Sequence, residues 1–121
     1  MIDIEEIREY ALGKPSTTEG FPFDETTLVF KVHNKMFLLL ALDSSPHQFN
    51  AKCDPERAIQ LREAYPDSVL PGYHMNKIHW NTIILNGTIT KKQILELIDH
   101  SYTLVASGGK KTAGKTKNNR T

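Results

Sequence analysis

The sequence predicts an α+β fold. We expect an antiparallel sheet of about four or more strands, with helices at both ends of the chain and one helix between the third and fourth strands. Three observations carry this prediction. Two amphipathic segments begin with capping-box signatures, three alternating segments follow one another across short turns, and a proline-initiated helix separates them from the last strand. Consecutive strands with short turns pair antiparallel, which argues against a βαβ repeat.

The first predicted helix covers residues 3–12. Asp3 can cap its N-terminus, Glu6 completes the capping box, and Gly13 ends it. Its apolar face consists of Ile4, Ile7, Tyr10 and Ala11. Residues 14–24 contain two prolines and a glycine and are predicted to form a loop. Within this loop, the segment Phe21-Pro22-Phe23 is expected to pack aromatic side chains against the sheet.

The first three strands are predicted at residues 26–33, 35–43 and 48–53. The first and third alternate in hydrophobicity, and the second is largely apolar. A tight turn at Asn34 joins the first two strands into a hairpin.

The middle helix is predicted from Asp54, its N-cap, to about Tyr65, because proline is favoured at the first helical position and Pro66 stops the helix. A fourth strand is expected at residues 79–85, followed by an Asn-Gly turn.

The last helix begins with a second capping box. Thr90 and Gln93 form it, and Gly108 or Gly109 is expected to end the helix. Its apolar side chains recur at helical spacing: Ile94, Leu95, Leu97, Ile98, Tyr102 and Val105.

The length of 121 residues favours a single domain, which we place at residues 1–106. Of the 15 Lys and Arg residues, ten lie in this domain against all 14 acidic residues, so its net charge is −4. Residues 107–121 form a tail that is predicted to be disordered, because it lacks apolar residues to bury. Its charged side chains are all basic: Lys110, Lys111, Lys115, Lys117 and Arg120. Such an arm is either an electrostatic contact for nucleic acid or a solubilising end.

A reduced, cytoplasmic protein is the simplest expectation. Cys53 is the only cysteine, so no internal disulfide is possible, and a buried structural role is favoured over a reactive thiolate. The N-terminus lacks the pattern of a signal peptide, and the longest apolar run, residues 36–42, is too short to span a bilayer. We expect no membrane association and favour a monomer.

Residues 71–82, with the sequence PGYHMNKIHWNT, are the hardest part of the chain to explain as ordinary amphipathic packing. Lysine can contact a phosphate, asparagine can pair with a base edge or the backbone, and aromatic rings can stack on a base. Together with a lysine from the third strand they form the candidate binding residues: Lys52, Tyr73, His74, Asn76, Lys77, His79, Trp80 and Asn81. The alternative is a structural corner with Trp80 in the core and asparagines capping local backbone groups.

No catalytic motif of known spacing occurs in the sequence. A phosphate-binding glycine loop, a nucleophile elbow and an HExxH motif are all missing, and a lone cysteine argues against a zinc site. His33 is expected in a turn and His100 at a helix end. We therefore predict no enzyme activity, no metal and no cofactor.

The chain resembles the MmcQ/YjbR family, which is bacterial. The motifs that carry the resemblance are FPF, LVFKVHNKMFLLL, NAKCDPERAIQLRE, PGYHMNKIHWNTI and LIDHSYTLV, which occur in family order across residues 1–106. The resemblance implies a CyaY-like fold, also compared to a double-wing DNA-binding domain, and therefore a DNA-binding role. The alternative is a protein-binding or small-ligand-binding module with no role on nucleic acid.

Overall fold

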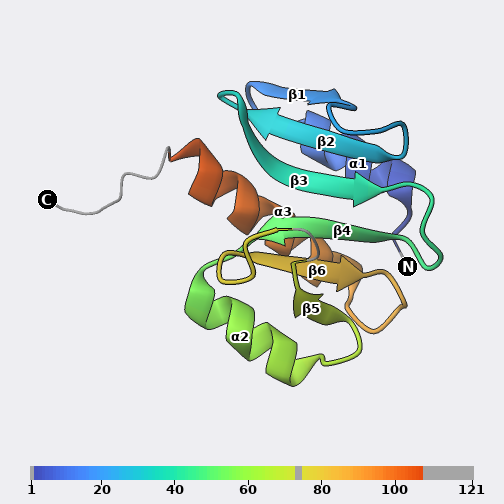
Figure 1. Ribbon diagram of the computed structural model, residues 1–121, viewed down its shortest axis with the longest axis vertical. Helices are drawn as coiled ribbons and strands as arrows, with labels where there is room; N and C mark the ends of the chain where they lie inside the picture. Colours follow the sequence, from blue (N-terminus) through green and yellow to red (C-terminus); the bar gives the residue numbers. More distant parts are fainter. Residues whose placement is uncertain (1, 73–74, 108–121) are drawn as a thin grey trace, which may run out of the picture.

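The computed structural model describes residues 2–72 and 75–107. Its centre is one antiparallel sheet of six strands in the order β1-β2-β3-β4-β6-β5 (Figure 1). The strands are β1 (Thr17–Gly20), β2 (Thr27–Val32), β3 (Lys35–Ala41), β4 (Gln48–Lys52), β5 (Val69–Pro71) and β6 (Trp80–Ile84). The predicted α+β class is therefore confirmed, with helices first and last and one helix after β4.

The helices are α1 (Ile4–Leu12), α2 (Pro55–Ala64) and α3 (Lys91–Ala106). Both predicted capping boxes form: the Asp3 carboxylate accepts from the Glu6 amide at 2.9 Å, and the Thr90 hydroxyl accepts from the Gln93 amide at 3.2 Å. Asp54 caps α2 with Pro55 at the first position, also as predicted. Side-chain capping satisfies amides that the first helical turn leaves unpaired.

The helices cover only one face of the sheet. Alternate side chains of β2, such as Leu28 and Phe30, join the main core with residues from α1 and α3. Leu61 of α2 and Tyr65, the residue that follows α2, pack against the same core. Figure 1 shows α1 and α3 behind the sheet and α2 beside β5. No helix of the described residues is long and apolar enough to cross a membrane.

The opposite face carries none of the helices of the described residues, and we call it the uncovered face. It carries a smaller apolar cluster of Val29, Leu39 and Trp80, with Met36 and Met75 packed against it. Successive side chains of β2 and β4 point to opposite faces of the sheet, as in other half-buried strands. Around the apolar cluster, the side chains that reach the uncovered face are mostly polar.

Two edge strands differ from the sequence prediction. Strand β1 lies inside the segment predicted as a loop, and β5 was not predicted at all. Neither has an apolar alternation: β1 reads Thr-Thr-Glu-Gly, and β5 has three residues and ends in a proline. Both form because an exposed strand edge, on β2 or on β6, supplies hydrogen-bond partners.

The aromatic residues of the 14–24 segment also differ from expectation. Phe21 and Phe23 remain 49% and 64% exposed, because this segment connects the edge strand β1 to β2 and does not lie over the core. The predicted hairpin turn is confirmed. His33 and Asn34 have φ values of 52° and 66°, the left-handed conformation that two-residue hairpin turns require.

Candidate functional site

The segment 71–82 forms the corner between the end of β5 and the start of β6. Tyr73 and His74 lie outside the described residues. In the remainder, the Asn76 side chain accepts from the Ile78 amide at 2.9 Å, and the Asn76 carbonyl accepts from the Trp80 amide at 2.9 Å. Asn76 is exposed, but it closes the turn that leads into β6. Its hydrogen bonds are local, as in other asparagine-initiated turns.

Arg62 of α2 ties this corner to the helix layer. Its Nε donates to Asn81 Oδ1 at 2.7 Å, and its Nη2 donates to the carbonyl oxygens of Lys77 and Trp80. Asn81 is only 1% exposed, and its Nδ2 donates to the Ala58 carbonyl at 3.4 Å. The planar guanidinium thus satisfies several oxygen acceptors at once. The side-chain groups of Asn81 are consequently engaged within the fold.

Gly72 and Trp80 make a close contact that explains another part of the segment. A Cβ atom on Gly72 would lie 2.7 Å from Trp80 Cβ and 2.9 Å from its carbonyl oxygen. The Gly72 amide donates to that same carbonyl at 2.8 Å. Trp80 is 8% exposed and belongs to the apolar cluster on the uncovered face. Its ring therefore packs within the protein, and the glycine permits the close approach of the two backbones.

Lys77, His79 and Lys52 remain as side chains with access to solvent. Lys77 and His79 are exposed, and Lys52 is half-buried at the end of β4, where it pairs in register with Trp80. The Lys77 ammonium has one long contact, 3.4 Å to the Gly72 carbonyl. The structure thus separates the predicted site residues into exposed basic ones and ones used by the fold.

Antiparallel pairing gathers the basic residues at one end of the sheet. Strands β2 and β4 end there, and β3 and β6 begin there (Figure 1). We name this group the lysine end: Lys31, Lys35, Lys52 and Lys77. None of the three ion pairs among the described residues uses any of these four lysines. Lys31 and Lys52 also occupy the uncovered face, as their register with Met36 and Trp80 shows.

Helix α3 ends at the same end of the sheet. The Ser101 hydroxyl donates to the Phe37 carbonyl at 2.5 Å and accepts from the Lys52 amide at 2.8 Å. The last turns of α3 therefore lie beside the lysine end, and the chain leaves the helix there at Ser107. The predicted electrostatic residues of the tail, from Lys110 to Arg120, lie outside the described residues.

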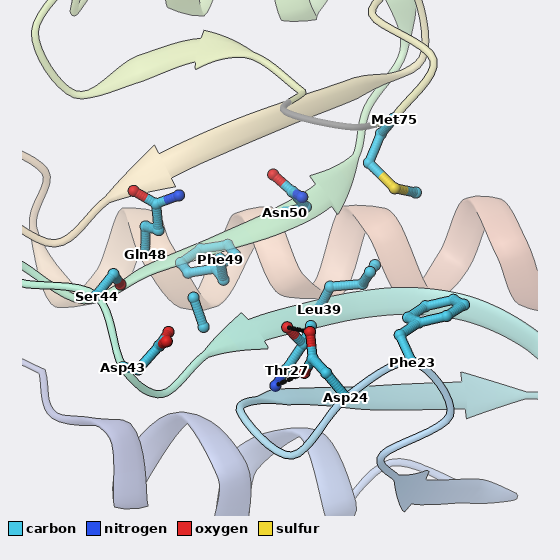
Figure 2. Close-up of a pocket in the computed structure, with 11 residues that line it drawn as sticks. Phe23, Asp24, Thr27, Leu39, Asp43, Ser44, Gln48, Phe49, Asn50 and Met75 are labelled. Carbon is cyan, nitrogen blue, oxygen red and sulfur yellow. Dashed lines mark hydrogen bonds between the residues drawn. The ribbon is translucent and has the colours of Figure 1, made fainter.

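The uncovered face is hollowed from its middle to the end opposite the lysine end. The hollow has a volume of about 460 Å³ and lies over β3 and β4, between the segment before β2 and the segment before β6 (Figure 2). Its lining combines apolar and polar side chains: Phe23, Asp24, Thr27, Leu39, Ala41, Asp43, Ser44, Gln48, Phe49, Asn50 and Met75. Among the described residues no Lys, Arg or His lines it, and the charged side chains that do are Asp24 and Asp43.

Asp24 is held in place by its own turn. One of its carboxylate oxygens accepts from the backbone amides of Thr26 and Thr27 at 2.9 and 2.7 Å. These hydrogen bonds lower the pKa of Asp24 below its usual value, with the Thr26 amide as the largest cause. The group is therefore ionised at neutral pH, and one of the two negative charges at the hollow is in a defined position.

Cys53 is buried and His100 is half-buried, and burial shifts the pKa of each side chain. The expected burial of Cys53 is confirmed by its 4% exposure, and this burial raises the pKa of its thiol. His100 lies inside α3, not at its end as predicted. Its Nε2 accepts from the Asp54 amide at 3.1 Å, and burial lowers its pKa. Within the described ranges, no group of three or more His, Cys, Asp or Glu is placed to hold a metal ion.

Sequence reasoning did not find the hollow. Its main side chains come from four separate segments: Phe23 before β2, Asp43 after β3, Gln48 on β4 and Met75 before β6. The available signals were the aromatic FPF segment and the polar positions of the β4 alternation. Neither indicates a shared site until the strand order places the segments side by side.

These features define the class: a small α+β protein with a six-stranded antiparallel sheet that the helices cover on one face. The family model of YjbR matches residues 12–104 of the chain, and the chain belongs to the YjbR family. The predicted family is thereby confirmed.

The relatives and the solved structures agree with this assignment. The "uncharacterized protein YbdF" of Escherichia coli O157:H7 is 34% identical over 104 residues, which cover 86% of this chain and 84% of the relative. The "uncharacterized protein YjbR" of Escherichia coli K12 is 32% identical, over 82% of this chain and 83% of the relative. The crystal structure of the DUF419 protein DR2400 from Deinococcus radiodurans superposes with a TM-score of 0.83 at 39% identity, covering 89% of this chain and 82% of that one.

Proposed function

We propose that the chain is a non-enzymatic DNA-binding protein that contacts duplex phosphates with the lysine end of its sheet and with its basic tail. The observation that carries the proposal is the gathering of four lysines at the end of the sheet where α3 ends. Four lysines without carboxylate partners among the described residues lie at one end of the sheet, and α3, the last element before the basic tail in the sequence, ends there at Ser107. Lysines arranged on one surface neutralise phosphates and release counterions.

The charge distribution of the domain supports an approach of DNA to the lysine end. The domain as a whole is acidic, with a net charge of −4 over residues 1–106, so DNA would be repelled from most of its surface. Asp24 and Asp43 lie at the end of the uncovered face opposite the lysine end. A duplex is therefore expected to approach from the lysine end, where the local charge is positive on the uncovered face.

The test is fluorescence anisotropy of a labelled duplex with the full chain at several salt concentrations. Each neutralised phosphate contributes about 0.9 to the slope of log K against log salt, so four lysines and five tail charges give a slope of at most about −8. Lys31→Gln with Lys52→Gln should reduce the slope by about 1.8. The matched control is Lys92→Gln, an exposed lysine in the first turn of α3 at the other end of the sheet, which should leave the slope unchanged.

Three results would contradict the proposal. The first is a full chain that does not bind duplex at about 50 mM salt, where phosphate contacts are strong. The second is a Lys92→Gln effect as large as that of the Lys31/Lys52 double variant. In the third, neutralising the five basic tail residues with glutamine abolishes binding while the double variant changes nothing, which would leave only attraction by the tail and no contact from the domain.

A second candidate is a small-ligand-binding module without a role on DNA. The hollow at the acidic end favours it, because concave sites lined by apolar side chains with a few polar groups are typical of ligand sites. The two candidates share one face, where the carboxylates of the hollow lie at the end opposite the lysine end, and they can be tested separately.

A further inference from the structure

We propose that the hollow on the uncovered face binds a small organic cation that has an apolar, preferably aromatic, body. The proposal deepens the second candidate function and does not depend on DNA binding. It rests on the shape of the hollow, on an exposed aromatic wall and on charge complementarity.

The size of the hollow fits a small molecule. Its volume of about 460 Å³ falls within the range of about 300–1,000 Å³ that is usual for ligand pockets. Leu39 and Ala41 of β3 lie beneath it, since both face the uncovered side of the sheet. The lining residues Phe23 and Met75 come from opposite sides of the hollow (Figure 2).

Phe23 gives the hollow an unusual wall. Its side chain is 64% exposed, the highest exposure among the large hydrophobic residues of the described chain. Aromatic side chains supply much of the contact area in binding sites, and their burial is favourable because apolar surface leaves water. Met75, opposite it, has a flexible and polarisable side chain that adapts to ligands of different shape. An aromatic or aliphatic ligand body would cover both side chains.

The charge of the hollow selects for a cation. Asp24 and Asp43 contribute two carboxylates, and neither belongs to any of the three ion pairs among the described residues. The Asp24 carboxylate is held ionised by two backbone amides. Because no basic side chain of the described residues lines the hollow, a bound cation would meet the negative charge of these carboxylates, whereas an anion would be repelled.

Polar groups around the apolar floor provide hydrogen-bond acceptors. Gln48 and Asn50 project from β4 to the same side of the sheet (Figure 2), and Asn50 Oδ1 accepts from the Thr82 hydroxyl. The Ser44 hydroxyl oxygen, in the wall beside Asp43, is buried and has no hydrogen-bond partner within the described residues. A few placed acceptors next to apolar surface would orient the donor hydrogens of an ammonium group.

The experiment compares three probes that share one aromatic body and differ in charge. Tryptamine is cationic, indole is neutral and indole-3-acetate is anionic at neutral pH. Each is titrated into the ¹⁵N-labelled full chain, and amide chemical shifts report both the affinity and the place of binding. Tryptamine should bind in a saturable manner and shift the amides of Thr27, Asp43 and Gln48. Indole should bind more weakly, and indole-3-acetate should bind least.

Two variants and a control test the assignment. Asp43→Asn removes an exposed charge whose side chain has no hydrogen bond to another described residue, and should weaken tryptamine binding about fivefold, the factor for one unit charge at about 4 Å in water. Phe23→Ala should weaken tryptamine and indole alike, because it removes the apolar wall. Glu96→Gln makes the same change in charge at an exposed position of α3, on the covered side of the sheet, and should leave all three affinities unchanged.

The proposal is overturned if tryptamine does not bind, if the three probes bind equally, or if the shifted amides lie away from the hollow. It also fails if Asp43→Asn and Glu96→Gln weaken tryptamine equally, since the effect would then be general attraction to an acidic protein. A chain with its five basic tail residues changed to glutamine distinguishes another occupant. If that chain binds tryptamine much more tightly, the occupant of the hollow in the unaltered protein is the tail and not a small molecule. The DNA-binding assay uses no variant of a residue that lines the hollow. Either proposal can therefore fail while the other stands.

Discussion

Replacing Arg62 with alanine should loosen the corner that carries the sequence PGYHMNKIHWNT. Arg62 is the residue of α2 that reaches both the buried Asn81 side chain and the loop carbonyls of Lys77 and Trp80. Arg62→Ala removes all of these donors at once. It leaves Asn81 Oδ1, in a residue that is 1% exposed, without its charged partner.

The size of the effect follows from these contacts. A hydrogen bond to a charged group contributes about 1.5–3 kcal/mol, and a buried acceptor left unsatisfied costs about 1–3 kcal/mol. Arg62 is half-buried, so water can replace its contact to the Lys77 carbonyl in part. We expect a loss of about 2–4 kcal/mol from the free energy of unfolding. The protein should still fold, because domains of this size are stable by about 5–15 kcal/mol.

The measurement is urea denaturation followed by the fluorescence of Trp80, the only tryptophan. With a slope of about 2 kcal/mol per molar urea, in the middle of the usual range, the midpoint should fall by about 1–2 M. Arg62→Lys should lose most of the same stability, because an ammonium group does not reproduce the guanidinium fork. Gln60→Ala, at an exposed position of the same helix, should change stability by less than about 0.5 kcal/mol.

Lys77→Ala is a second control for the corner. Arg62 contacts the backbone carbonyl of Lys77, and the Lys77 side chain is exposed with one long contact to Gly72. Its removal should therefore cost less than about 0.5 kcal/mol. The reasoning is refuted if Arg62→Ala destabilises no more than Gln60→Ala does. A large loss of stability from Lys77→Ala would make that side chain a fold residue and weaken its assignment to the lysine end.

Two further predictions concern packing and pH. Gly72→Ala should destabilise the protein by about 1–3 kcal/mol, because the new methyl group would overlap Trp80; thermal unfolding checks this, and an unchanged melting temperature would contradict the close contact. His100 has a folded-state pKa below the ordinary 6.5, mainly through burial, so its contribution to stability is complete above pH 6.5 and is lost as pH falls toward the folded-state pKa. His100→Gln, which keeps an acceptor for the Asp54 amide, should lack this part of the pH dependence. The free energy of unfolding is measured for both proteins between pH 7 and 5, and an equal slope against pH would refute the prediction.

The helices were predictable from the sequence because their signals are local. The capping boxes of Asp3 with Glu6 and of Thr90 with Gln93 join residues three positions apart, and both form as predicted. The central strands were predictable for a similar reason, since alternation along one strand is visible without its neighbours. The edge strands β1 and β5 were not, because their own residues lack alternation and their formation depends on the strand beside them.

In the candidate site, too, local sequence and tertiary packing contribute different information. The sequence indicated that residues 71–82 were exceptional, but it did not separate fold residues from exposed ones. Asn81 is a fold residue because Arg62, 19 positions earlier, approaches it across the α2–β6 contact. Lys77 and His79 remain at the surface in the same segment. Only the packing of the helix against the sheet makes this distinction.

By itself, the sequence determined the α+β class, the family, the caps of the helices and the unusual charge of the tail. These depend on residue types and short spacings, which act within a few positions of the chain. The tertiary structure alone decided which lysines share one end of the sheet and that Phe23, Asp43, Gln48 and Met75 border one hollow. Strand order and register bring distant segments together, and no local pattern encodes them.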